Sequence, residues 1–565
     1  MTKVEQIEKL IHQGHYFEAR SLATAALIES DDLRLKQLSA LAISKSGGAL
    51  AAKDYLEPIY KQHPEDPETA GILGGIYKEL FKNSQETKYA LLSRDTYYQN
   101  FIATGNYYTG INAATMSIIA GKAVKGKEIA GELITKLSEE SSDFWEVATL
   151  AEAHLLKRDK AKAMSLYFQL IQQAGDDWGK VNSVFNQLWL LNHYLPVPSE
   201  ILKAFSPPTI VGFVGHMVDR KDRIIPRFPE AIELKVKNGI LNAIKTLNAK
   251  IGYCSLACGS DILFAEAMAE TNAQVTIYLP FNTQDFVETS VAFAGEHWIK
   301  RFDNLIKKYP VKVMTSERFD GNSELFSFHG RVLLGTSLLK SQMLHADAGL
   351  ITVQSIRDQE GKEGGTRDMI KTWPFPNKII NINPDDLYSS TRLVVKIEAQ
   401  AVSEFSAKVK PVRFLLQTLI QGIKPEEMEQ IIKHITKSDP PILEVPEYII
   451  NEGKSFLTVF TSARGAFDFG QLILRSVKPQ NVQLSLHAGP IAIDHQESQQ
   501  NITGTTITEI NAISSHALPG LVYCSEQLAA LLVMERQDLL FHPVGRIDLG
   551  HEWKEMEIYT IDLLQ

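Results

Sequence analysis

The sequence is poor in cysteine, has no long apolar run and carries no excess of positive charge. Three cysteines in 565 residues indicate a reducing compartment, and Cys254 and Cys258 lack the His or Cys pair that would complete a zinc site. No apolar run approaches a membrane span, and the start lacks a signal core. A net charge of -9 gives no electrostatic footprint for DNA or RNA. We therefore expect a cytoplasmic protein with neither a nucleic-acid nor a membrane partner.

What is present is an ordinary soluble composition, 44% hydrophobic and 22% charged, in a chain too long for one core. The proline-rich string Ser206-Pro-Pro208 marks a linker. We expect three domains: an all-α repeat domain over residues 1–200, an α/β domain over 206–392 and an α+β domain over 408–565.

The first domain carries apolar residues at three- and four-residue spacing, which is typical of helices. A short pattern recurs in Gly14–Ala19, Gly47–Ala52 and Arg158–Ala163. A residue that closes one helix, followed by an alanine where the next helix packs, is how tetratricopeptide-type helix pairs stack. Periodicity alone fits a generic helical bundle nearly as well.

Two further strings, Glu68–Lys78 and Tyr107–Ala114, resemble a helical-repeat module. This module is known from the TRAF-binding region of apoptosis-signal-regulating kinases and also occurs in bacterial signalling proteins. The resemblance covers residues 1–190. It implies a solenoid that recruits a protein partner on its concave surface and performs no chemistry.

Strand-like and helix-like blocks alternate after the linker, which predicts a parallel, doubly wound, Rossmann-like sheet. The expected strands are Thr209–Val214, Ile251–Cys254, Val275–Leu279, Ala348–Val353 and Asn377–Ile382. The expected helices include Ala231–Leu247 and Asp261–Glu270.

Three loops after these strands carry glycines with small or cationic residues: Gly215–Arg223, Ser255–Asp261 and Glu363–Asp368. Ligands of such sheets bind beyond the carboxyl ends of the strands, where backbone N–H groups bind anions. The loops together indicate a phosphate-bearing ligand. The expected contacts are Gly215, His216, Arg220, Arg223, Gly259, Ser260, Asp261, Gly364, Gly365, Thr366 and Arg367. His216 either orients a base or ribose or is a solvated loop side chain.

These loops resemble the SLOG superfamily, which includes the Lonely Guy phosphoribohydrolases and several nucleotide-sensing domains. Gly364–Asp368 is similar to a shortened form of the family's Pro-Gly-Gly-x-Gly-Thr-x-x-Glu loop and lacks its Pro. The resemblance implies a nucleotide or nucleotide-derived ligand. We expect no metal site and identify no certain cofactor. If the domain cleaves an N-glycosidic bond, Glu363 or Asp368 would replace the family's catalytic Glu.

The last domain resembles a class III nucleotidyl cyclase through Phe456–Phe460, Gln483–Pro490 and a closing strand that ends at Tyr559. Such enzymes need two Asp that hold metal ions, an Asn, an Arg and a Lys. The corresponding positions hold Gln417, Lys454, Thr508, Ala512 and Gly550. Losing the metals and the phosphate-stabilising Arg removes the main electrostatic terms of phosphoryl transfer. The resemblance thus implies a ferredoxin-like domain without cyclase activity, kept for dimerisation or sensing.

Three functions fit these observations. The first is a signalling or stress-response protein whose central domain binds a nucleotide-derived ligand, whose repeats recruit a partner, and which forms a homodimer or larger homo-oligomer. The second is a nucleotide or NAD N-glycosidase or phosphoribohydrolase acting through the central domain. The third is a scaffold in which all domains serve assembly. We favour them in this order; the sequence leaves open whether the protein is an enzyme.

Overall fold

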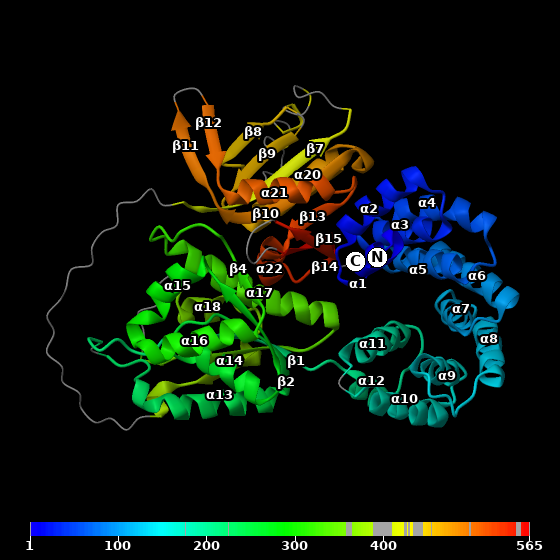
Figure 1. The fold of residues 1–565 in the computed structure, drawn as a ribbon, viewed down its shortest axis with the longest axis horizontal. Coiled ribbons are helices and arrows are strands. Elements are labelled where there is room, and N and C mark those ends of the chain that lie inside the picture. The colour runs from blue at the N-terminus through cyan, green and yellow to red at the C-terminus, as the bar shows by residue number, and fades with distance from the viewer. Residues whose placement is uncertain are drawn as a thin grey trace. The chain divides into compact units, whose positions relative to one another are not determined.

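Figure 1 shows the fold of the protein in a computed structural model. The described residues are 2–175, 177–223, 225–357, 364–387, 410–422, 427, 430–432, 435, 444–453, 455–496, 499–549 and 555–563. The chain divides into two compact units, Met1–Pro207 with Val544–Arg546 and Pro208–Pro543 with Ile547–Gln565. Within the described part, no helix is both long and apolar enough to cross a membrane.

The first unit is built of helices that pack against their neighbours in sequence (Figure 1). They are α1 (Lys3–His12), α2 (Tyr16–Glu29), α3 (Leu33–Lys45), α4 (Ala49–Gln62), α5 (Pro67–Ser84), α6 (Thr87–Thr104), α7 (Tyr107–Ile119), α8 (Ala123–Lys136), α9 (Phe144–Leu156), α10 (Lys160–Ala174), α11 (Trp178–Asn192) and α12 (Ser199–Phe205). The predicted helical repeat region is confirmed.

The recurring sequence pattern has a shared conformation. Gly14, Gly47 and Arg158 have positive φ values of 82°, 94° and 66°, respectively, and each lies two residues after the last residue of a helix. A left-handed residue at this place stops a helix and turns the chain toward the next one. The alanine five residues after each is fully buried: Ala19, Ala52 and Ala163. The pattern therefore marks the turn within a helix pair and the contact that closes it.

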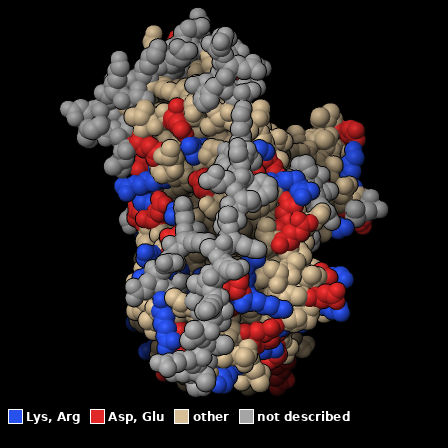
Figure 2. Space-filling model, turned by 90° about the vertical axis from the view of Figure 1, so that its left-hand side faces the viewer, with Lys and Arg blue, Asp and Glu red and all other residues tan. Residues whose placement is uncertain are grey.

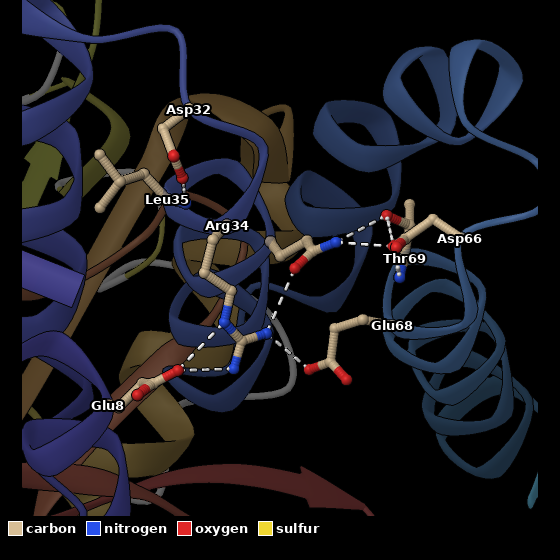
Figure 3. A network of polar contacts seen from close by, with 8 residues as sticks. Glu8, Asp32, Arg34, Leu35, Asp66, Glu68 and Thr69 are labelled. Atoms are coloured by element: carbon tan, nitrogen blue, oxygen red, sulfur yellow. Dashed lines mark hydrogen bonds and ion pairs between the residues drawn. The ribbon is translucent and has the colours of Figure 1, made fainter. Parts of the chain in front are cut away.

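Polar side chains join the first three odd-numbered helices (Figure 3). Arg34 of α3 donates hydrogen bonds to Glu8 of α1 at 3.0 and 2.8 Å and to Glu68 of α5 at 2.7 Å. Nearby, the amide of Gln37 donates to Asp66 at 2.7 Å and to Thr69 at 2.9 Å. The arginine is part-exposed, so its ion pairs add little stability and mainly fix the register between neighbouring repeats.

A second polar network lies further along the same unit and joins α5, α7, α9 and α11. Lys78 of α5 donates to Gln187 of α11 at 2.9 Å, and Gln187 donates to Glu152 of α9 at 2.7 Å. Thr115 of α7 also donates to Glu152. Burial lowers the pKa of Lys78 to about 8 and raises that of Glu152. The hydrogen bond between Lys78 and Gln187 thus connects α5 directly to α11, although these helices are far apart in the sequence.

The second unit begins with a parallel sheet whose strand order is β4-β3-β2-β1-β5-β6. The strands are β1 (Thr209–Gly215), β2 (Ala249–Cys254), β3 (Gln274–Leu279), β4 (Val311–Val313), β5 (Ala348–Val353) and β6 (Ile379–Ile382). Every residue of β5 is buried, as expected for a parallel strand covered on both faces. The predicted sheet is confirmed, with β4 as an edge strand that the sequence pattern did not indicate.

The helices between these strands are α13 (Glu233–Leu247), α14 (Ser260–Glu270), α15 (Thr283–Ser290), α16 (Glu296–Lys308), α17 (Glu324–Leu344) and α18 (Thr366–Thr372), with short 3-10 turns at Glu230–Ile232, Ala292–Ala294, Pro376–Lys378 and Pro384–Asp386. Right-handed crossovers from β1 toward β4 place α13, α14 and α16 on one face. The chain then returns to β5 on the other side of β1, so α17 and α18 cover the opposite face.

A mixed sheet of order β14-β15-β13-β10-β7-β9-β8 follows. Its strands are β7 (Val412–Ile420), β8 (Tyr448–Asn451), β9 (Ser455–Phe460), β10 (Val482–Pro490), β13 (Val522–Ser525), β14 (Leu539–Asp548) and β15 (Glu555–Leu563). A separate hairpin joins β11 (Ala492–Gln496) to β12 (Gln499–Thr503), and a 3-10 turn spans Pro479–Asn481.

Helices α20 (Ala463–Ser476) and α22 (Glu526–Glu535) contact each other and the mixed sheet, and α21 (Thr505–His516) packs on β10, β7 and β13. One apolar cluster runs from the parallel sheet through α17 and α22 into the mixed sheet. The two sheets of the second unit therefore share a continuous core.

Candidate ligand-binding site

The strand order places β1 at the centre of a topological switch. β2 lies on one side of β1 and β5 on the other, so the connections leaving the carboxyl ends of these strands diverge. Such a point is where open α/β sheets bind ligands. A cavity of about 390 Å³ lies there, lined by residues from β1, the loop after β2, and α14, α15, α17 and α18. Its volume is within the usual range for small-molecule sites.

The cavity gathers residues from all three predicted loops. The predicted contacts that line it are Gly215, His216, Asp261, Gly364, Gly365, Thr366 and Arg367. They are far apart in the sequence and come together because parallel strands end at the same edge of the sheet.

The glycines are required because the backbones approach closely. A Cβ on Gly215 would lie 2.2 Å from the hydroxyl of Ser260. Gly259 has φ +107°, and a Cβ there would lie 2.5 Å from the backbone nitrogen of Val218. At Gly364, with φ +74°, the added atom would lie 2.7 Å from the backbone nitrogen of Ser327. Any larger residue would push these loops apart.

Four predicted contacts do not line the cavity. Arg220 stacks on Phe293 with its guanidinium carbon 4.1 Å from the ring centroid, and Arg223 pairs with Asp219 at 3.2 Å. The hydroxyl of Ser260 is fully buried and donates to the backbone carbonyl of His216 at 2.7 Å. Together with Gly259, these residues stabilise the loops around the cavity and do not themselves line it.

Of the two carboxylates considered for catalysis, the structure describes Asp368, and it does not line the cavity. Asp368 accepts a hydrogen bond from the backbone N–H of Gly364 at 3.1 Å and so closes the turn before α18. Glu363 lies outside the described residues. Asp261 is the described carboxylate that does line the cavity.

Asp261 is only 8% exposed. The backbone N–H of Ala257 donates to its carboxylate at 3.2 Å. Burial disfavours the charged form more than this bond favours it, and raises the pKa of Asp261 to about 7. The side chain can therefore hold or release a proton near neutral pH.

Two cavity residues with basic side chains, Arg227 and His329, were missed in the sequence. Arg227 lies just beyond the first loop, where its backbone N–H and that of Phe228 donate to Asp219 and fix the turn. His329 lies inside α17, where no loop or glycine signal marks it. Burial lowers the pKa of His329 to about 4, so the ring is neutral at pH 7 and Nε2 donates to the carbonyl of Tyr278 at 2.8 Å. With that tautomer, Nδ1 is an acceptor.

Three aromatic residues, Phe213, Phe286 and Phe326, also line the cavity. Flat apolar rings beside arginine side chains suit a ligand that has both a planar group and an anionic group.

On the face drawn in Figure 2, acidic and basic side chains are interspersed among the described residues, and neither sign forms a continuous patch. Positive charge is thus not a general property of this surface.

The cyclase-like positions look different. Gln417 of β7 is 5% exposed, and its amide donates to Asn511 at 2.8 Å and to Glu452 at 3.1 Å. Thr508 is exposed on α21 and Ala512 is part-buried beside it. Lys454 and Gly550 lie outside the described residues. Among the residues that the structure describes, no group of three or more His, Cys, Asp or Glu could hold a metal ion.

Residues 15–117 match the family model described as Tetratricopeptide Repeats-Sensor. This match, which runs into α7, confirms tetratricopeptide-type repeats in that part of the chain. The more specific resemblances to the TRAF-binding region and to SLOG domains stay predictions. A search of curated proteins finds no match.

Among solved structures, a thermophilic tetratricopeptide-repeat protein of Thermus thermophilus is 16% identical, covers 33% of this chain and 97% of its own, and has a TM-score of 0.28. The guanylate cyclase domain of RhGC from Catenaria anguillulae in complex with GTP is 14% identical, with 28% and 100% covered and a TM-score of 0.23. The adenylyl cyclase CyaB from P. aeruginosa is 12% identical, with 27% and 93% covered and a TM-score of 0.22. Similarity this low says nothing about ligand or activity.

Proposed function

We propose that the protein is a signalling or stress-response protein whose central domain binds a nucleotide-derived ligand in the cavity at the β1–β5 switch point. One observation carries this proposal: glycine loops from three strand ends converge on a cavity that also holds Arg227, Arg367 and three aromatic rings. Backbone N–H groups and arginine side chains would hold phosphate, and the aromatic rings would hold a base.

The other regions complete this function. The helical repeats would recruit a protein partner, and the mixed sheet would serve dimerisation or sensing. The filled cyclase-like position supports a role without nucleotide turnover in that domain, because Gln417 already bonds to protein groups.

A thermal-shift panel tests the ligand proposal. The intact protein is heated with AMP, ATP, NAD, ADP-ribose and cyclic AMP, each at millimolar concentration. At least one of these should raise the melting temperature of wild type and raise that of Arg367→Ala by less. No shift with any compound would reject a nucleotide site, and light scattering that shows the same oligomer in every condition would then favour the scaffold function.

Asp261 gives a specific reason to keep the hydrolase as a second candidate. A cavity carboxyl group with a pKa of about 7 can exchange a proton with a leaving base or an attacking water. If the protein cleaves an N-glycosidic bond of NAD or AMP, Asp261→Asn should lower the release of free base by at least tenfold, as monitored by chromatography. Equal release by wild type and this variant, or none by wild type, would remove this candidate.

A further inference from the structure

Helix α17 forms one wall of the cavity. Phe326, His329, Gly330 and Leu333 of this helix all line it. With about 3.6 residues per turn, positions separated by three, four and seven residues fall on one stripe of a helix. One side of α17 therefore faces the proposed ligand over two turns.

The opposite side of the same helix contacts the mixed-sheet part of the second unit. A Cβ on Gly335 would lie 1.9 Å from the backbone oxygen of Ala530 in α22, so the two helix backbones touch without an intervening side chain. Further along, the amide of Gln342 donates to the carbonyl of Leu539 at 2.9 Å and accepts from the N–H of Phe541 at 3.3 Å. At the start of α17, Glu324 accepts from the N–H of Val412 at 3.1 Å.

Glu324, Gly335 and Gln342 lie about half a turn around the helix from the cavity stripe. A single helix thus separates the cavity from the mixed sheet. Backbone contact at Gly335 leaves no rotatable side chain to absorb a shift, because packed interiors move between discrete arrangements rather than deforming smoothly.

A second connection passes through β3. His329, which lines the cavity, donates to the backbone carbonyl of Tyr278 at 2.8 Å. The hydroxyl of Tyr278 donates to the buried carboxylate of Glu526, the first residue of α22, at 3.1 Å. Lys312 of β4 donates to both oxygens of the same carboxylate at 2.7 Å. The start of α22 is thereby tied to the strand that holds His329.

We propose that α17 transmits ligand occupancy of the cavity to α22 and the mixed sheet, and that the docking of α22 in turn sets the affinity of the cavity. This coupling rests on the proposed function, since it needs a ligand that occupies the cavity. Linkage makes the effect reciprocal: a change at the α17–α22 contact alters ligand affinity by the same factor as the ligand alters that contact.

The test uses full-length Gly335→Ala, in which the added methyl group would clash with the backbone of Ala530 and push α22 away from α17. Gly239→Ala is the matched control, because its methyl group would meet Ile382 on the other face of the parallel sheet at 3.0 Å. NAD or ATP, whichever shifts the melting temperature, serves as the probe. Hydrogen–deuterium exchange is followed over Glu526–Glu535, and the dissociation constant is measured by calorimetry.

In wild type and Gly239→Ala, the probe should slow exchange of Glu526–Glu535 at least twofold. In Gly335→Ala this slowing should vanish, and the dissociation constant should change by at least threefold. If Gly335→Ala does not fold, Gln342→Ala, which loses two hydrogen bonds without adding volume, replaces it. The coupling would be overturned if a saturating concentration of the probe left the exchange of α22 unchanged in wild type. An unchanged dissociation constant in folded Gly335→Ala, or in Gln342→Ala where it replaces that variant, would also overturn it.

The absence of binding by any probe would reject the proposed function and still leave the contact testable. Ligand-free Gly335→Ala should then exchange faster than Gly239→Ala over Phe326–Leu333, the cavity side of α17. Equal exchange there would overturn the transmission through α17 by itself.

Discussion

At the carboxyl ends of β1 and β5, polar and apolar side chains surround a cavity of about 390 Å³, whereas at the cyclase-like position of the mixed sheet the polar side chains bond to one another. Asp261 faces the cavity with one weak backbone bond. Gln417 instead donates to both Asn511 and Glu452. The difference separates a site with room for a ligand from one in which protein groups already satisfy each other.

The largest effect should appear at the cavity carboxyl group. The pKa of Asp261 is raised to about 7 in the folded protein from an ordinary 3.8. The folded state thus binds this proton more tightly, and the stability that it contributes is lost as pH rises from about 4 to about 7. Asp261→Asn removes the titrating group. Between pH 4 and pH 8, the free energy of unfolding of wild type should therefore fall by about 2–4 kcal/mol more than that of Asp261→Asn. Urea titrations of both proteins at the two pH values measure this, and a difference that stays constant would show that Asp261 is solvated.

The next effect concerns the cations around the cavity. Arg367→Ala and Arg227→Ala should weaken nucleotide binding about ten- to a hundredfold, since a hydrogen bond to a charged group contributes about 1.5–3 kcal/mol. Arg223→Ala is the control: it removes the same charge from a side chain paired with Asp219 and absent from the cavity lining. Calorimetry with the nucleotide that binds wild type should show less than a threefold change for this variant. Equal losses for all three would indicate general electrostatic attraction instead of a built site.

A smaller effect should follow from restoring a cyclase-type carboxylate. Gln417→Asp removes the amide donor and places a second carboxylate near Glu452, so the free energy of unfolding should fall by about 1–3 kcal/mol at pH 7. Thr508→Asn, at an exposed position, should stay within about 0.5 kcal/mol of wild type. Neither variant should form cyclic nucleotide from ATP or GTP with Mg²⁺. Turnover by Gln417→Asp would show that the mixed sheet retains more of the cyclase machinery than the described positions indicate.

The smallest effect should come from Ser485, the cross-strand neighbour of Gln417 on β10. Its hydroxyl is fully buried and finds no hydrogen-bond partner among the described residues. Ser485→Ala should therefore be neutral or stabilise the protein by up to about 1 kcal/mol. Thr458→Val, which loses a buried bond to the carbonyl of Leu416, should cost about 1 kcal/mol in the same unfolding experiment. A cost for Ser485→Ala equal to that control would mean that an ordered water or ligand satisfies the hydroxyl.

The elements that the sequence predicted best are those with strong local signals. The buried strand Ala348–Val353 is a continuous apolar run. The turn in Gly14–Ala19 begins with a glycine that adopts a positive φ after a helix. Helix α17 is buried on several of its sides, so its sequence lacks a clear amphipathic pattern. For this reason the sequence analysis predicted neither the helix nor a role for His329.

The site was predictable at the level of loops and less so at the level of side chains. Three glycine loops at strand ends predicted the edge of the sheet at which the cavity lies, because strand order fixes where the loops meet. Which arginine faces the cavity depends on turns that the sequence does not encode in any simple spacing. Arg223 pairs with Asp219, while Arg227, four residues later, lines the cavity.

Ligand binding in the cavity is tested most directly by purifying the full-length protein without added ligand, denaturing it and identifying the released small molecules by mass spectrometry. If the ligand binds in the cavity, wild type and Gln417→Asp should release a phosphate-bearing nucleotide derivative, and Arg367→Ala should release much less of it. Release of the same nucleotide from Arg367→Ala but not from Gln417→Asp would place the ligand at the mixed sheet and exclude the cavity as its binding site.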